Sequence, residues 1–130
     1  MRRIVVLCCA ALCADLLCQG CTETIRGTEG DIEAKIKYGT LNATMDRGID
    51  RVFEAVQLTI EELGLTTIMA EQDGVAAEVL ARDAQEQNVT IKLEALSPNR
   101  TALTMRVGLL GDENKSRVIF REVQENLRAR

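Results

Sequence analysis

Residues 46–82 read DRGIDRVFEAVQLTIEELGLTTIMAEQDGVAAEVLAR, and the spacing of their apolar residues changes at Gly64. Before Gly64 the apolar residues recur every three or four positions, which predicts an amphipathic helix formed by Ile49, Val52, Phe53, Val56, Ile60 and Leu63. Asp46 or Thr44 is the expected N-cap, and Gly64 is expected just past the C-terminal end. Beyond it, extended segments over residues 65–71 and 75–82 flank Asp73-Gly74, a typical hairpin turn.

Two further strands and a second helix are predicted downstream. Polar residues separate Val89, Ile91 and Leu93, and the same alternation relates Leu103, Met105 and Val107 across the turn formed by residues 97–100. Asp112 or Asn114 is then the expected cap of a helix with a narrow apolar stripe of Val118, Ile119, Val123 and Leu127.

Upstream of the first helix, one more strand is predicted. Ala34, Ile36 and Tyr38 alternate with charged residues, and Leu41 and Ala43 continue in the opposite phase, which indicates a bulge or bend at Gly39. The predicted order is strand, helix, four strands, helix. Short connections favour an α+β fold in which an antiparallel sheet of about five strands carries both helices on one face.

The first 21 residues contain all five cysteines of the chain. Two arginines precede an apolar run of residues 4–17, which is the length of a secretory signal and too short for a membrane span. The run leads to Gly20-Cys21, which resembles the end of the lipobox of bacterial lipoproteins. Gln19 and Cys18 stand where that motif usually has a small residue and leucine.

The resemblance implies cleavage between Gly20 and Cys21 and attachment of acyl chains, such as palmitate, to Cys21. An unprocessed form, or a plain secretory signal with incidental cysteines, is the alternative. The predicted organisation is a signal peptide over residues 1–20, an acylated start and flexible tether over 21–31, and a single domain over 32–130. By the sorting rule of enterobacterial lipoproteins, Thr22 after the cysteine implies the periplasmic face of the outer membrane.

The folded part also resembles a family of small bacterial envelope lipoproteins known only as a domain of unknown function. The match covers roughly residues 33–127 and rests on Gly39-Thr40-Leu41-Asn42-Ala43, Val52-Phe53-Glu54-Ala55, Glu62-Leu63-Gly64, Val89-Thr90-Ile91-Lys92-Leu93, Arg106-Val107-Gly108, Gly111-Asp112 and Ser116. These motifs are mostly apolar and turn positions. The resemblance therefore implies a fold, and among site residues only the lipidated cysteine. The layout is also loosely similar to the helix-grip domains of lipoproteins that accompany outer-membrane protein insertion.

The residues that are absent argue against an enzyme. The chain has no histidine, and Ser97 and Ser116 are its only serines, so a Ser-His-acid triad and imidazole-based zinc chemistry are excluded. Carboxylate clusters are expected to be solvated, or in turns and caps: Glu61-Glu62, Asp112-Glu113 and Glu122-Glu125. We expect no catalytic residue, no metal site and no cofactor. The net charge of −4 also argues against binding to nucleic acid.

One surface is predicted to be available for a partner. If the apolar residues of the last two strands face the helices, then Thr90, Lys92, Thr104 and Arg106 face away, on the side that an antiparallel sheet can leave open. The expected function is that of a membrane-anchored accessory or structural domain that interacts with an envelope protein. The alternative is a module that binds a small ligand or lipid between sheet and helices, although two phenylalanines, one tyrosine and no tryptophan offer little aromatic lining.

Overall fold

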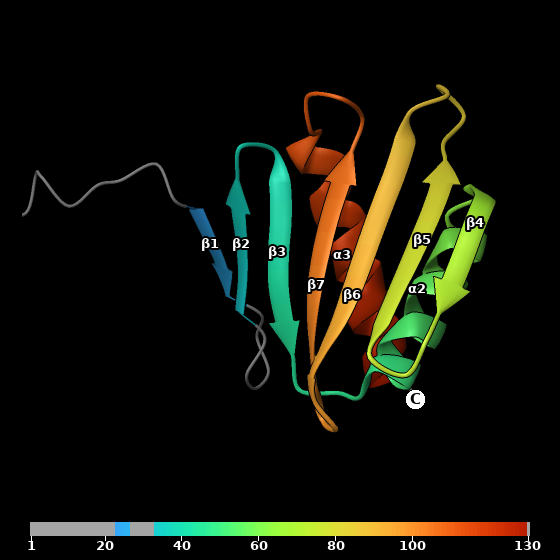
Figure 1. The fold of residues 1–130 in the computed structure, drawn as a ribbon. Coiled ribbons are helices and arrows are strands. Elements are labelled where there is room, and N and C mark those ends of the chain that lie inside the picture. Colours follow the sequence, from blue (N-terminus) through green and yellow to red (C-terminus); the bar gives the residue numbers. More distant parts are fainter. Residues whose placement is uncertain (1–22, 27–32, 130) are drawn as a thin grey trace, which may run out of the picture.

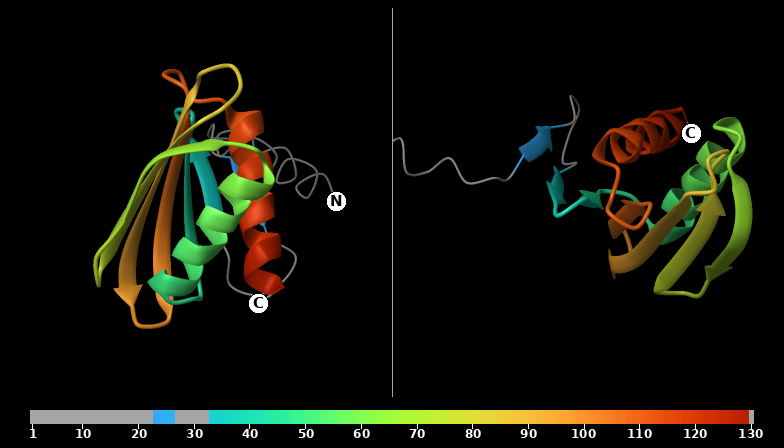
Figure 2. Two further views of the ribbon diagram at one scale, coloured as in Figure 1. Left: turned by 90° about the vertical axis from the view of Figure 1, so that its right-hand side faces the viewer. Right: turned by 90° about the horizontal axis from the view of Figure 1, so that it is seen from above.

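The computed structural model describes residues 23–26 and 33–129. Within these residues seven strands form one antiparallel sheet in the order β1-β2-β3-β7-β6-β5-β4 (Figure 1). The strands are β1 (Glu23–Arg26), β2 (Glu33–Lys37), β3 (Thr40–Met45), β4 (Thr66–Gln72), β5 (Ala76–Arg82), β6 (Asn88–Ser97) and β7 (Arg100–Val107). Helices α2 (Ile49–Glu62) and α3 (Glu113–Arg128) pack side by side on one face (Figure 2). The predicted α+β class is confirmed.

The sheet has more strands than the five or so predicted, because the segment around Gly39 is a tight hairpin. Lys37 pairs with Thr40, so Tyr38 and Gly39 alone form the turn, and both have positive φ (52° and 75°). This is the backbone of the two-residue turns that suit the twist of a hairpin. The prediction of one strand with a bulge or bend at Gly39 is therefore wrong, and β2 and β3 are separate strands.

Strand β1 was not predicted. It lies within the segment expected to be a flexible tether, and it pairs with β2 so that Glu23 is opposite Ile36 and Arg26 is opposite Glu33. The other residues of the predicted tether, and the whole predicted signal peptide with Gly20 and Cys21, lie outside the described residues.

The core lies between the sheet and the two helices. The six residues predicted to face the helices from β6 and β7 are all at most 2% exposed: Val89, Ile91, Leu93, Leu103, Met105 and Val107. Ala34, Ile36, Leu41, Ala43 and Met45 extend this layer over β2 and β3. The alternation of the strands thus leaves a second face of the sheet that neither helix covers (Figure 2).

The helix ends follow the sequence in part. Leu63 is the C-cap of α2, and Gly64 follows with φ 71°, as predicted. At the other end the N-cap is Gly48, without a side-chain cap, so the prediction of Asp46 or Thr44 is wrong. Asp46 instead pairs with Arg100 at 3.1 Å, which ties the start of α2 to the β6–β7 turn.

Helix α3 is capped as predicted but packs through a different stripe. Asp112 is the N-cap, and its side chain accepts from the Lys115 N–H at 3.0 Å. Val118 is 50% exposed, so its predicted place in the core stripe is wrong, whereas Phe120 is only 2% exposed. Of the other predicted positions, Ile119, Val123 and Leu127 are buried.

Candidate functional site

The open face of the sheet brings the four predicted interaction residues together. Thr90 is directly opposite Arg106, and Lys92 is directly opposite Thr104, on the adjacent strands β6 and β7. Three of these residues also contact neighbouring residues. Lys92 Nζ lies 4.0 Å from Glu78 Oε1, Thr104 Oγ1 donates to Asn42 Oδ1 at 3.3 Å, and the Arg106 guanidinium donates to the Leu109 carbonyl.

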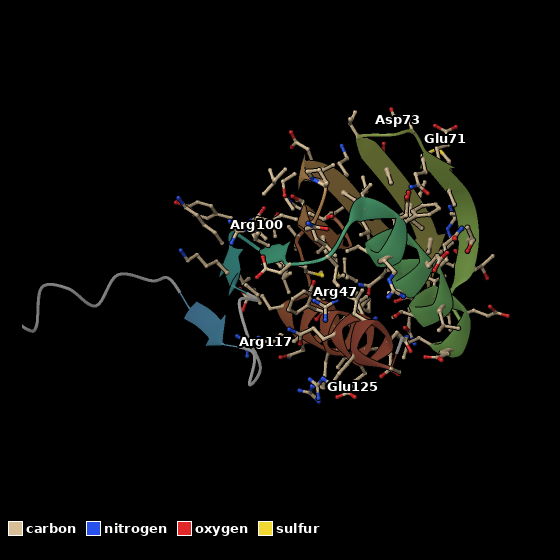
Figure 3. All side chains as sticks on the ribbon, turned by 90° about the horizontal axis from the view of Figure 1, so that it is seen from below. Arg47, Glu71, Asp73, Arg100, Arg117 and Glu125 are labelled. Carbon is tan, nitrogen blue, oxygen red and sulfur yellow. The ribbon has the colours of Figure 1, made fainter. Side chains whose placement is uncertain are left out.

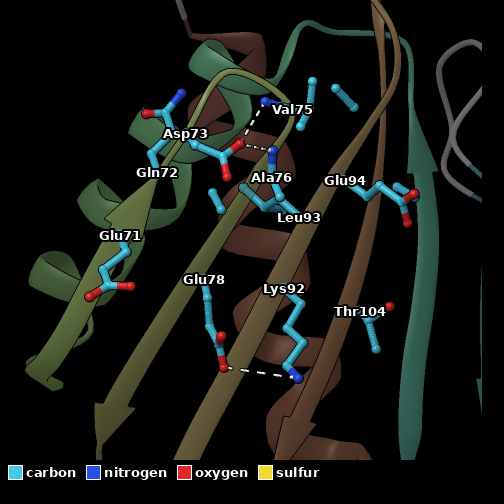
Figure 4. Close-up of a pocket in the computed structure, with 13 residues that line it drawn as sticks. Glu71, Gln72, Asp73, Val75, Ala76, Glu78, Lys92, Leu93, Glu94 and Thr104 are labelled. Carbon is cyan, nitrogen blue, oxygen red and sulfur yellow. Dashed lines mark hydrogen bonds and ion pairs between the residues drawn. The ribbon is translucent and has the colours of Figure 1, made fainter.

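Beside these residues the open face is hollowed. A depression of about 900 Å³ extends over β4 to β7, and Figure 4 shows Glu71, Glu78, Glu94 and Lys92 around it. A smaller hollow of about 230 Å³ adjoins it and shares Ala102 and Thr104 with it. The side chain of Ala102 is small, which leaves room on the sheet surface where a larger residue would fill it.

The charged side chains that line the large hollow are mainly acidic. Glu71, Asp73, Glu78 and Glu94 line it, and Lys92 is the only basic residue that does so among the residues that the structure describes. Asp73 is occupied by its own turn, because its Oδ1 accepts from the N–H groups of Val75 and Ala76 at 2.8 Å each. These backbone hydrogen bonds lower the pKa of Asp73 below its usual 3.8.

Two of the acidic residues lie directly opposite each other. Glu71 on β4 pairs in register with Glu78 on β5, an arrangement that destabilises a sheet when nothing neutralises it. A bulge between Thr67 and Met69 creates this pairing, because it shifts the register of β4 by one residue. Without that shift Glu71 would be opposite Ala77, which is buried on the face that packs against the helices.

Figure 3, a view from below, shows where some of the charged residues lie. Glu71 and Asp73 lie at the β4–β5 hairpin, whereas Arg117 and Glu125 lie on α3.

The carboxylate clusters noted in the sequence do not line the hollow. Glu61 and Glu62 are exposed at the end of α2, and Asp112 caps α3. Among residues 23–26 and 33–129, no three acidic, histidine or cysteine side chains gather closely enough to hold a metal ion.

A second cavity lies between the sheet and the helices. It has about 360 Å³ and is lined mainly by apolar groups, with Val89, Val107 and Ile119 from the core and Leu63 and Val118 from the surface. Lys115 also lines it, and its Nζ donates to Asp83 Oδ2 at 2.8 Å, to Gln87 Oε1 at 2.6 Å and to Gln85 Oε1 at 3.2 Å. These bonds tie the β5–β6 loop to the start of α3.

The acidic pair was not predicted, and neither were the residues that line this cavity, although a ligand site between sheet and helices was the alternative expected from the sequence. The register of β4 depends on the bulge, for which the sequence has no clear signal, and the cavity depends on how two helix ends meet a loop. A third unpredicted feature is a group of exposed apolar side chains at one end of the sheet: Tyr38 (86% exposed), Leu109 (93%) and Leu110 (93%).

No curated protein matches the chain significantly. In the part of the chain that the structure describes, neither helix is long and apolar enough to cross a membrane. A family model described as "Protein of unknown function (DUF3568)" matches residues 3–126, nearly the whole chain. The chain therefore belongs to the DUF3568 family.

Proposed function

We propose that the protein is a lipid-anchored, non-catalytic docking domain of the bacterial cell envelope. Acyl chains on Cys21 attach it to the outer membrane, and the hollow on its open sheet face binds a lysine- or arginine-bearing segment of an envelope protein. The observation that carries the docking role is the opposition of Glu71 and Glu78 in a depression of about 900 Å³.

Charge complementarity favours a basic partner. Two carboxylates on adjacent strands repel each other, and Lys92 reaches one of them only at 4.0 Å. A cationic side chain seated between the strands would relieve that repulsion. An extended peptide suits the shape, since the hollow crosses four strands and its floor contains the small residues Ala76 and Ala102.

Lipid anchoring is supported by the sequence and by the extent of the family match. Gly20-Cys21 follows an apolar run of secretory length, and the family model begins at residue 3, so that segment is part of the family pattern. The test is metabolic labelling with a clickable palmitate analogue in bacterial cells. We expect label on the wild-type chain and none on Cys21→Ser. Unlabelled wild-type protein in the soluble fraction would refute the anchor.

Docking is tested with defined peptides. A fluorescent eight-residue peptide that alternates lysine and threonine is titrated with the full-length protein, and a glutamate–threonine peptide serves as the negative probe. Glu71→Gln/Glu78→Gln is expected to weaken binding of the basic peptide by about tenfold, the effect of losing two partly exposed charge pairs. Binding should also weaken as salt is raised.

The matched control removes the same charge from the helix side. Glu54→Gln/Glu61→Gln changes two exposed carboxylates of α2 and should leave peptide binding unchanged. Equal weakening by both double variants would mean that only the net charge attracts the peptide, and would refute a site in the hollow. In cells, a photo-crosslinker at Thr104 should capture a partner in the wild type and lose it in Glu71→Gln/Glu78→Gln.

The apolar cavity favours a second candidate function, the binding of a small ligand or lipid. Its volume of about 360 Å³ falls in the range of small-ligand sites, and a lysine lies at its edge. Native mass spectrometry of the purified protein tests it, since a bound ligand would add mass. Ala84→Trp would fill the exposed mouth and abolish that mass, whereas Ala129→Trp at the far end of α3 would not.

A further inference from the structure

We infer that Tyr38, Leu109 and Leu110, here called the apolar tip, form a second contact with the lipid surface and fix the orientation of the domain on the membrane. The inference rests on the proposed anchoring at Cys21 and goes beyond it, because acyl chains alone would attach the domain without orienting it. The occupant of the tip is the interfacial layer of a phospholipid bilayer.

The two leucines are exposed because they lie in the hydrogen-bonded turn that follows β7. Gly108 and Gly111 bracket them, both with positive φ (72° and 79°). The turn is closed by a hydrogen bond from the Asp112 N–H to the Val107 carbonyl at 2.8 Å, and the Arg106 guanidinium donates to the Leu109 carbonyl. These hydrogen bonds hold the turn while both leucine side chains are 93% exposed.

The turn of the β2–β3 hairpin lies directly against this loop and adds the aromatic side chain. A Cβ built on Gly39 would lie 2.6 Å from the Leu110 carbonyl oxygen, so the two backbones are in contact. Tyr38, immediately before Gly39, is 86% exposed. The three apolar side chains therefore belong to one protruding end of the sheet, which is the upper end in Figure 1.

The composition of the tip matches a membrane interface. Tyrosine is enriched at the level of lipid headgroups, and lysine and arginine keep their charges in the headgroup layer while their stems lie along apolar surface. Lys37 Nζ lies 5.4 Å from the centre of the Tyr38 ring, and Arg106 is held at the base of the leucine turn. Exposed apolar residues with basic neighbours are the pattern of segments that lie in an interface.

The position of the anchor supplies the second, independent argument. The register of β1 sets Glu23 opposite Ile36, two residues from Tyr38 on the neighbouring strand. Cys21 precedes Glu23 by two residues, which span at most about 7 Å, and adjacent strands are about 4.8 Å apart. Acyl chains on Cys21 would therefore reach the bilayer at the end of the sheet that carries the tip, and not at the end that carries the Asp73 turn.

Tyr38 itself reports whether this contact forms. It is the only tyrosine, and the chain has no tryptophan, so the intrinsic fluorescence of the protein comes from the tip alone. The mature lipidated protein is reconstituted into vesicles of phosphatidylethanolamine and phosphatidylglycerol, with and without brominated phospholipid. Flotation is measured first, because it reports the anchor separately from the tip.

If the tip meets lipid, brominated lipid should quench the Tyr38 emission by at least about half. Acrylamide should quench the emission less when vesicles are present than in detergent-free buffer without vesicles. Leu109→Ser/Leu110→Ser should still float but lose most of the quenching by lipid. Val75→Ser/Leu96→Ser, which removes two exposed apolar side chains near the other end of the sheet, should behave like the wild type.

Each other outcome contradicts the inference in a distinguishable way. Protein that floats without lipid quenching retains its anchor but has no tip contact. Protein that neither floats nor incorporates palmitate refutes the proposed anchoring and with it the inference. Protection of Tyr38 from acrylamide that depends on protein concentration and appears without vesicles would assign the tip to contact between two copies.

Discussion

Gly39 and Gly111 lie backbone against backbone, and neither position has room for a side chain. A Cβ on Gly39 would lie 2.8 Å from the Gly111 Cα, and a Cβ on Gly111 would lie 2.7 Å from the Gly39 carbonyl carbon. This contact joins the β2–β3 turn to the loop that leads into α3, so it both closes one end of the core and builds the apolar tip.

The first prediction concerns this contact. Gly111→Ala should destabilise the protein by more than about 2 kcal/mol, since it adds a backbone clash to a strain of about 1–2 kcal/mol for a left-handed residue. Gly64 separates the two effects, because it has φ 71° but no atom within 4 Å of its Cβ position. Gly64→Ala should therefore cost only the strain. Urea denaturation measures both, and equal losses would contradict the proposed close contact.

The second prediction concerns acid stability and Asp83. Its carboxylate accepts from Lys115 Nζ and from the N–H groups of Gln87 and Gln85, and these bonds, led by that of Lys115, lower its pKa below 3.8. A pKa that is lower in the folded state means that Asp83 stabilises the fold at higher pH. That contribution is lost as the pH falls through the lowered value.

Asp83→Asn should therefore be less stable than the wild type from about pH 5 to 7, and the gap should shrink below about pH 4 as the wild-type carboxylate becomes protonated. Salt should also reduce the gap, because a lysine is the leading partner. Asp73→Asn is the control: backbone N–H groups cause its lowered pKa, so its gap should depend less on salt. Urea midpoints between pH 3 and 7 measure both. A gap for Asp83→Asn that widened toward acid would contradict the assignment.

A third prediction concerns the polar link between the helices. Asn126 Nδ2 donates to Thr59 Oγ1 at 2.9 Å and to Glu62 Oε2 at 3.1 Å, and the Thr59 hydroxyl donates to the Ala55 carbonyl at 2.7 Å. Thr59 is fully buried. Thr59→Val should cost about 1–3 kcal/mol, because it leaves a buried amide hydrogen without that acceptor.

The double variant Thr59→Val/Asn126→Leu should recover part of this loss, since it removes both polar partners together. Thr67→Val on the exposed strand β4 is the matched control and should change stability by no more than about 0.5 kcal/mol. Strictly additive losses in the double variant would show that the two residues do not interact. Denaturant titration of the wild type, Thr59→Val, Asn126→Leu and the double variant completes the cycle.

The elements that could be predicted are those with a strong local signal. Helical periodicity ended by Gly64, and the Asp73-Gly74 turn, are properties of a few consecutive residues, so α2 and the β4–β5 hairpin follow from the sequence. The turn at Tyr38 could not be predicted, because a tyrosine rarely adopts positive φ. Strand β1 has four residues and lies at the edge of the sheet, where no alternating pattern is needed.

The candidate site was predictable only where alternation alone decides the face. Thr90, Lys92, Thr104 and Arg106 lie on the open face as predicted, because their neighbours in β6 and β7 are strongly apolar. Glu71 could not be assigned to that face, since the bulge after Thr67 reverses the phase of β4.

The last prediction concerns which apolar side chains of α3 are buried. The predicted apolar stripe contains Val118 and not Phe120, but α3 packs against α2 and the sheet at once, and that double contact buries Phe120 and leaves Val118 half exposed. Phe120→Ala should cost about 3–5 kcal/mol, as expected for a large side chain removed from a core. Val118→Ala should change stability by only about 0.5 kcal/mol. Thermal and urea unfolding measure both, and a large loss for Val118→Ala would mean that α3 is rotated about its axis relative to the packing described.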